Sequence, residues 1–301
     1  MARALVIGSR GSKLALWQAE QARECLLALH PQIDIKIEII KTTGDVKSEP
    51  LSVIGGKGVF TKELEDALLD GHIDIAVHSL KDLPTILPEG LAISAICERE
   101  DPRDALVLRS GLSGSLLDLH DGAVVGTSSQ RRLAQLKALR PDVLVKDLRG
   151  NVDTRIRKLD EGQYDAVILA SAGLLRLGLE NRISARIAPS EMLPAVGQGA
   201  IAIETRSDDS FAVGTTARLD HRETRLACLA ERAFLRGLGG GCQLPIAAHA
   251  TIDRDVLTLD GLVARPDGSE IWRDQSFGPT NEAEQLGSAL ATLLIKNGAL
   301  L

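Results

Sequence analysis

The stretch Ala4-Leu5-Val6-Ile7-Gly8, with the segments that follow it, decides the fold. It is a short apolar run typical of a buried strand, and residues 13–29 behind it form a helical pattern with Ser12 as a candidate N-cap. Isoleucines at 33, 35, 37 and 39 then alternate with charged residues, which indicates a second strand. A helix over 61–69 and strands over 73–78 and 91–96 continue the alternation. Strands that alternate with helices predict a mostly parallel sheet.

A second unit of the same kind follows the charged segment Arg99–Asp104, which marks a crossover. Residues 193–199 break the pattern before a strand at 200–204, which can return to the first sheet. We therefore predict an α/β fold of two periplasmic-binding-protein-like lobes with a double crossover, enclosing a ligand cleft. The second unit comprises strands over 123–126, 143–148 and 166–170, and helices over 128–139 and 152–159.

The character of the chain changes after about residue 218. A helix over 222–235 and a closing helix over 281–296 flank three strand-like segments with hairpin turns between them, at 246–252, 256–264 and 270–277. This pattern predicts a small α+β domain with a three-stranded antiparallel sheet. The predicted domains are residues 1–98 with 194–217, residues 99–193, and residues 218–301, the last carrying Cys242 in a glycine-rich loop.

Composition excludes several classes of protein. The 301 residues are 44% hydrophobic and 25% charged, as in globular proteins, and the net charge of −6 gives no sign of nucleic-acid binding. The sequence shows no signal peptide and no apolar stretch long enough to cross a bilayer, so we expect a cytoplasmic protein without membrane contact. The six histidines show no i, i+4 pairing and the four cysteines form no Cys-x-x-Cys pair, so we expect no metal site.

Arginines follow three strands of the second unit. Between Thr127 and Arg176 ten Lys and Arg residues stand against six Asp and Glu, a local charge of +4 in a chain of −6. Gly126-Thr-Ser-Ser129 joins a strand to a helix, a geometry that binds carboxylate or phosphate. Arginine side chains bind carboxylates in bidentate fashion, so the set suits a ligand with several carboxylates. The alternative is a series of surface ion pairs with Asp142, Asp147 or Asp153.

Two further residues could carry chemistry. Asp82 ends the segment His78-Ser-Leu-Lys-Asp82 beyond a strand, where it could steady a cation or exchange a proton. A structural ion pair of Lys81 with Asp82 is the alternative. Cys242 lies within Gly237-Leu-Gly-Gly-Gly-Cys-Gln-Leu-Pro245, where the glycines leave its thiol accessible as a nucleophile. An inert loop cysteine is the alternative.

Seven motifs occur in order between Leu5 and Pro245: Arg10-x-Ser12, Gly55-Gly-Lys-Gly58, His78-Ser-Leu-Lys-Asp82, Gly126-Thr-Ser-Ser-Gln-Arg-Arg132, Leu148-Arg-Gly-Asn-Val-Asp-Thr-Arg155, Pro194-Ala-Val-Gly-Gln-Gly199 and Gly240-Gly-Cys-Gln243. Together they resemble the porphobilinogen deaminase family. Gln130 stands where that family usually has leucine, and Gly240 where an acidic residue is common. Neither departure removes a charge or a nucleophile that the mechanism needs.

The resemblance implies a monomeric transferase of tetrapyrrole biosynthesis. Such an enzyme condenses four porphobilinogen molecules head to tail, releases ammonia at each step and forms hydroxymethylbilane. It carries a dipyrromethane cofactor as a thioether, here on Cys242, and Asp82 matches the catalytic aspartate. The resemblance assigns cofactor binding to Lys81, Asp82, Ser128, Ser129, Arg131, Arg132 and Arg155, and substrate binding to Arg10, Ser12, Arg149, Arg155 and Arg176.

Two other functions compete with this interpretation. A non-catalytic two-lobed anion-binding protein would explain the arginines and the cleft, but it leaves Cys242 and Asp82 without roles. A cysteine hydrolase is unsupported because no histidine motif accompanies the thiol. The loop over 42–58 has the composition of a surface loop, and we interpret it as a lid.

Overall fold

The computed structural model describes residues 4–42, 61–240 and 244–299. These residues form two compact units. Unit 1 comprises residues 1–99 and 200–225, and unit 2 comprises residues 100–199 and 226–301. The predicted division into three domains, with its boundaries, stays a prediction, as does the cleft between the lobes.

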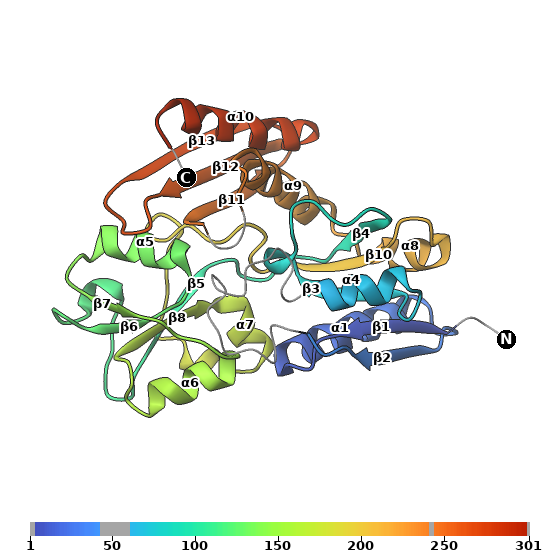
Figure 1. Ribbon diagram of the computed structural model, residues 1–301, viewed down its shortest axis with the longest axis horizontal. Coiled ribbons are helices and arrows are strands. Elements are labelled where there is room, and N and C mark those ends of the chain that lie inside the picture. Colours follow the sequence, from blue (N-terminus) through green and yellow to red (C-terminus); the bar gives the residue numbers. More distant parts are fainter. Residues whose placement is uncertain (1–3, 43–60, 241–243, 300–301) are drawn as a thin grey trace. The chain divides into compact units, whose positions relative to one another are not determined.

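The sheet of unit 1 has the strand order β2-β1-β3-β10-β4 (Figure 1). β1 runs parallel to β2 and β3, whereas β10 is antiparallel to both of its neighbours. All strands of this sheet except β10 run in the same direction, which confirms the predicted mostly parallel sheet. β10 is antiparallel because the returning chain enters at the end where β3 finishes and pairs Ile201 with Ser79. The elements are β1 (Leu5–Ser9), α1 (Lys13–Leu29), β2 (Ile35–Ile39), α4 (Lys62–Leu69), β3 (Ile75–Ser79), β4 (Leu91–Ile96), β10 (Ile201–Arg206) and α8 (Ser210–Thr216).

Alternation along β3 gives the sheet of unit 1 two different faces. Ile75 and Val77 belong to the apolar cluster under α1. Ala76 belongs to the cluster under α4, and His78 lies on the same face because successive strand residues point to opposite sides. The Oγ of Ser12 accepts a hydrogen bond from the backbone N–H of Ala15, which confirms the predicted N-cap of α1.

The sheet of unit 2 repeats the topology of the first, with the order β7-β6-β8-β5-β9. β5 directly follows the first crossover and occupies the antiparallel place that β10 holds in unit 1. Each sheet thus receives its antiparallel strand from the segment that crosses into it, which confirms the double crossover and the two periplasmic-binding-protein-like lobes. The elements are β5 (Asp104–Leu108), β6 (Val124–Gly126), α5 (Gln130–Leu139), β7 (Leu144–Lys146), α6 (Val152–Asp160), β8 (Ala166–Ala170), α7 (Ser171–Arg176) and β9 (Ala185–Arg186).

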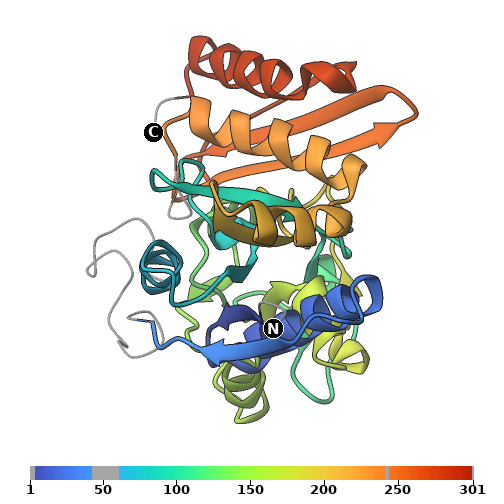
Figure 2. The ribbon, with the colours of Figure 1, turned by 90° about the vertical axis from the view of Figure 1, so that its right-hand side faces the viewer.

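The C-terminal part of unit 2 is the predicted α+β arrangement. Its three strands form an antiparallel sheet in the order β11-β12-β13, and two helices lie against it, orange and red in Figure 2. Gly261 explains the close packing, since a Cβ there would lie 2.8 Å from both Leu290 and Phe234 of those helices. The elements are α9 (Arg222–Gly237), β11 (Ile246–Asp253), β12 (Val256–Ala264), β13 (Ile271–Pro279) and α10 (Ala283–Lys296).

Candidate active site

A recess of about 70 Å³ in unit 1 brings together three of the predicted site residues: Arg10, Ser12 and Asp82. Arg10 and Ser12 form the turn between β1 and α1, and Asp82 ends the short 3₁₀ helix Leu80–Asp82 that follows β3. Because β1 and β3 are parallel neighbours, their carboxyl ends meet at one edge of the sheet. This edge is where ligands bind in open α/β sheets.

The recess offers groups of complementary charge. Arg10 is half-buried and Asp82 is exposed, so a guanidinium and a carboxylate both face the same small space. The wall behind them is fixed by the buried side chain of Gln18, whose Nε2 donates to the Oγ of Ser79 over 2.9 Å. Lys81 is half-buried beside Asp82 in the chain. The recess can hold a carboxylate on Arg10 while Asp82 faces a cation or an N–H group.

The turn that we predicted to bind an anion joins β6 to α5 in unit 2. Ser129 is the N-cap of α5, and its Oγ accepts from the backbone N–H of Arg132. Gly126 is required because a Cβ there would lie 2.8 Å from the ring of Tyr164. The Oγ of Ser128 donates to the carbonyl of Leu148 over 2.7 Å, so this hydroxyl also ties β6 to the next strand end.

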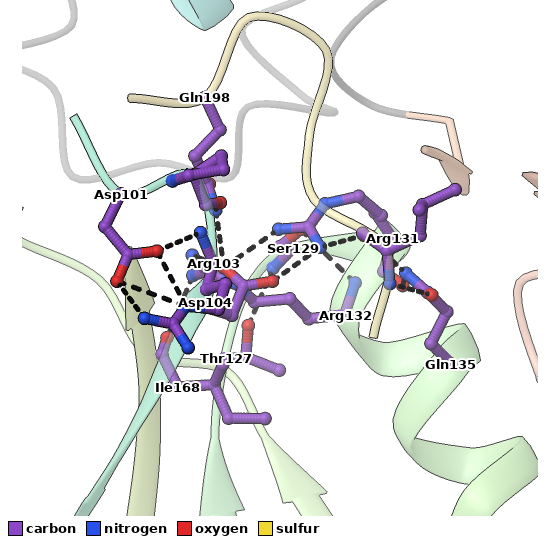
Figure 3. Close-up of polar contacts among 12 residues, drawn as sticks. Asp101, Arg103, Asp104, Thr127, Ser129, Arg131, Arg132, Gln135, Ile168 and Gln198 are labelled. Atoms are coloured by element: carbon purple, nitrogen blue, oxygen red, sulfur yellow. Dashed lines mark hydrogen bonds and ion pairs between the residues drawn. The ribbon is translucent and has the colours of Figure 1, made fainter. Parts of the chain in front are cut away.

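Arg131 and Arg132 lie in a buried cluster around Asp104 (Figure 3). Asp104 is 0% exposed and the two arginines are 5% and 6% exposed. Nη1 of Arg131 lies 2.7 Å from Oδ2 of Asp104, and Nη2 of Arg132 lies 2.7 Å from Oδ1. Arg132 also donates to the carbonyl of Ile168 over 2.8 Å. From the sequence we expected these arginines to face an anionic ligand, and we did not predict their pairing with Asp104.

The charges of this cluster do not cancel, because two guanidiniums face one carboxylate. Burial by itself would raise the pKa of Asp104, yet the positive charges of Arg131 and Arg132 hold it well below its usual range. Burial also lowers the pKa of Arg132, and the nearby Arg131 adds to this, against the opposing charge of Asp104. The cluster therefore carries an excess positive charge that an anionic group would balance.

Gln198 and Leu193 connect the second crossover to this cluster. Nε2 of Gln198 donates to Oδ1 of Asp104 over 3.0 Å and to the carbonyl of Pro102 over 2.7 Å. Arg131 donates to the carbonyl of Leu193 over 2.8 Å. The sequence analysis singled out the segments that contain these residues: Asp104 ends the charged stretch Arg99–Asp104, and Gln198 belongs to the Pro194–Gly199 motif. No local sequence pattern, however, indicates that either residue contacts α5.

Arg149 and Arg155 gather around Asp147 at the next strand end. Nε of Arg149 lies 2.6 Å from Oδ2 of Asp147, which is the surface ion pair that the alternative interpretation anticipated. Burial raises the pKa of Asp147, but hydrogen bonds from Ser128 and Arg149 and the charges of Arg149 and Arg155 lower it by more. Nη2 of Arg176 donates to the carbonyl of Gly199 over 2.6 Å. Ser128, Arg149 and Arg155 thus lie together in unit 2.

Several predicted features lie outside the described residues. These are Cys242, the Gly55–Gly58 motif and the proposed lid from residue 43 to 58. Within the described part of the chain, no group of three or more His, Cys, Asp or Glu side chains is arranged to hold a metal ion.

Comparison with known proteins identifies the family. Residues 5–213 match the model of the porphobilinogen deaminase, dipyromethane cofactor binding domain, and residues 225–296 match that of the porphobilinogen deaminase C-terminal domain. A porphobilinogen deaminase from Chromobacterium violaceum is 53% identical over 296 residues, covering 98% of this chain and 95% of that protein. The chain belongs to the porphobilinogen deaminase family.

Solved structures with a similar fold are more distant. The second substrate binding domain of a putative amino acid ABC transporter from Streptococcus pneumoniae has a TM-score of 0.46 at 12% identity, covering 79% of this chain and 95% of that chain. A VFT2 domain of BvgS from Bordetella pertussis has a TM-score of 0.42 at 18% identity, covering 72% and 85%. The strand order, not these likenesses, defines the fold.

Membership of the porphobilinogen deaminase family confirms the predicted function. The protein is a transferase of tetrapyrrole biosynthesis that condenses four porphobilinogen molecules head to tail, with release of ammonia, to hydroxymethylbilane. The first matching model is named for a dipyrromethane cofactor, which confirms the predicted cofactor. The alternative of a non-catalytic anion-binding protein is not favoured. The roles of individual residues stay predictions.

Proposed function

We propose that Asp82 is the catalytic carboxylate of this porphobilinogen deaminase, and that Arg10 and Ser12 bind the incoming substrate beside it. The recess that these three residues share is the observation that carries the proposal. A guanidinium at Arg10 is suited to a pyrrole carboxylate, and the exposed Asp82 can stabilise the cation that forms as ammonia departs. Arg149 and Arg176 are the proposed further contacts to substrate carboxylates.

We propose that Ser128, Ser129, Arg131, Arg132 and Arg155 bind the carboxylates of the dipyrromethane cofactor, with Lys81 and Asp82 as further contacts. The donor set fits such a group. The helix N-terminus at Ser129 favours negative charge, and the Asp104 cluster has an excess positive charge in a buried place. When bound, the cofactor supplies the primer on which the pyrrole chain grows. The protein's part is to fix the carboxylates so that this primer is held in one orientation.

The attachment of the cofactor to the thiol of Cys242 by a thioether is part of the same proposal. So are a monomeric state and a cytoplasmic location. No helix within the described residues is both long enough and apolar enough to cross a bilayer. Porphobilinogen is the small-molecule partner, and neither nucleic acid nor membrane enters the proposal.

The proposed role of Asp82 is tested by Asp82→Asn. The exposed side chain contributes little to packing, so the variant keeps its fold and its melting temperature. Removing the carboxylate removes the charge that stabilises the cation, and we expect turnover to fall by about 10²–10⁴-fold. Ammonia release and hydroxymethylbilane formation are the assays. Normal ammonia release by Asp82→Asn would remove this residue from the mechanism.

A further inference from the structure

A buried His–Glu pair adjoins the recess in unit 1. His78 of β3 is paired with Ala202 of β10, and Glu204 of β10 is paired with Ala76, so both side chains lie on the face under α4. Nε2 of His78 lies 3.0 Å from Oε2 of Glu204, although the two atoms are not aligned for a hydrogen bond. His78 is 5% exposed and lines the recess, whereas Glu204 is 0% exposed.

α4, which packs over this face, brings two further carboxyl groups toward the pair. α4 contributes Glu65, which is buried, and beyond it Asp66. Burial raises the pKa of Glu65, and the charges of Glu204 and Asp66 add to this, while Thr61 and His78 act in the opposite direction. Glu204 is the carboxyl group that faces the imidazole, with its Oε2 3.0 Å from Nε2 of His78. Arg10 and Asp82 are the charged groups on the recess side.

Packing does not account for such a pair. Moving a carboxylate and an imidazole out of water costs free energy, and apolar side chains of similar volume often stabilise a helix–sheet interface better. Both oxygens of Glu204 and the Nε2 of His78 lack an aligned partner among the described residues, so the pair is not a completed structural network. Because His78 lines the same recess as Asp82, the pair is in a position to take part in the reaction.

The reaction requires a place to hold a proton. In each condensation the bond from the aminomethyl carbon to nitrogen breaks, and the electron pair leaves with ammonia. A carbon–carbon bond then forms, and the attacking pyrrole carbon loses its proton. The substrate amine arrives as ammonium and leaves as ammonia. The proton that the attacking pyrrole carbon loses converts this ammonia back to ammonium, and the overall reaction is then balanced. Between these two events a protein group must carry the proton.

We propose that His78 and Glu204 form a proton relay behind Asp82, an inference that rests on the proposed role of Asp82. His78 takes the proton from Asp82 through the recess, and Glu204 stabilises the imidazolium 3.0 Å away. His78 then passes the proton to the ammonia already released, which becomes ammonium. The recess of about 70 Å³ is large enough to hold water, which can bridge the imidazole and the carboxylate.

The test uses the full-length holoenzyme with Glu204→Gln, which removes the charge but keeps the shape. We expect kcat to fall about 100-fold, as for loss of a proton-transfer group, while KM and the cofactor adduct detected by intact mass stay unchanged. The matched control is Glu38→Gln. Glu38 makes a comparable contact of 2.6 Å with His72, but both side chains are exposed. This control should keep wild-type kcat.

A second variant tests the imidazole itself. His78→Ala should lose turnover to a similar extent, and added imidazole should restore part of it by filling the space left beside the recess. If His78 had only a structural role, imidazole would not restore turnover. Absence of this rescue would therefore refute the relay, and so would a wild-type kcat in Glu204→Gln. If Asp82→Asn lost turnover while Glu204→Gln kept it, the relay would be refuted and the proposed role of Asp82 would stand. If Asp82→Asn kept turnover, the assignment of Asp82 would fail and the relay with it.

Discussion

The substitution Asp104→Asn tests the buried charge cluster of unit 2. The carboxylate is 0% exposed and accepts hydrogen bonds from Arg131, Arg132 and Gln198. An asparagine keeps the volume but removes the charge that both guanidiniums face. Removing one partner of a buried ion pair leaves the other charge uncompensated and costs about 3–5 kcal/mol. We therefore expect the free energy of unfolding to fall by about that amount.

Urea denaturation of the wild type and the variant measures this difference, with Asp160→Asn as the matched control. Asp160 also pairs with an arginine, Arg182, through two contacts, but both side chains are partly exposed. Exposed pairs contribute roughly 0–1 kcal/mol. A loss of less than about 1 kcal/mol in Asp104→Asn would refute the reasoning, since the cluster would then stabilise no more than a surface pair.

The pH dependence gives the same test a second readout. The pKa of Asp104 is depressed in the folded state, so the carboxylate binds protons less readily there than in the unfolded chain. Its contribution is fully present above the unfolded pKa of about 3.9 and is lost as pH falls through the folded pKa. The difference between wild type and Asp104→Asn should stay constant from about pH 5 to 8 and narrow only below about pH 4.

Two further predictions concern substrate binding and helix packing. Arg149→Leu should reduce hydroxymethylbilane formation by about tenfold or more, because a charge-assisted contact to a carboxylate contributes roughly 1.5–3 kcal/mol. Unchanged kinetics would show that Arg149 serves only as the surface ion-pair partner of Asp147. Gly287→Ala should lower the free energy of unfolding by about 1–3 kcal/mol, because its Cβ would collide with the backbone carbonyl of Ala230. The matched control Gly214→Ala, where a Cβ meets no atom within 4 Å, should instead stabilise by about 0.4–1 kcal/mol in the same denaturation assay.

Local patterns predicted most elements of the fold, because each is encoded in a few consecutive residues. The helix over Lys13–Leu29 and the strand over Leu91–Ile96 have the predicted bounds. β5 was missed because its short apolar run follows a charged segment and does not alternate. The antiparallel direction of β10 was also missed, because direction depends on where the chain re-enters the sheet and not on its own side chains.

The candidate site was predicted as a set of residues, but its pairings were not. The turns after β1 and β3 bring Arg10 and Asp82 to one recess, as parallel strands require. The partner of Arg131, in contrast, is Asp104, which stands 27 positions away on another element. The pairing of His78 with Glu204 likewise depends on the register of two strands that are distant in sequence. Such pairings arise from tertiary structure and leave no local pattern.

The central claim is that the glycine-rich loop anchors the dipyrromethane cofactor through Cys242. Intact-mass analysis of the purified active enzyme, followed by peptide mapping, tests it directly. We predict a mass above that of the sequence by two pyrrole units, located on the peptide that carries Cys242 and absent from those with Cys25, Cys97 and Cys228. Active enzyme with an unmodified, freely alkylatable Cys242, or with the adduct on another cysteine, would contradict the account.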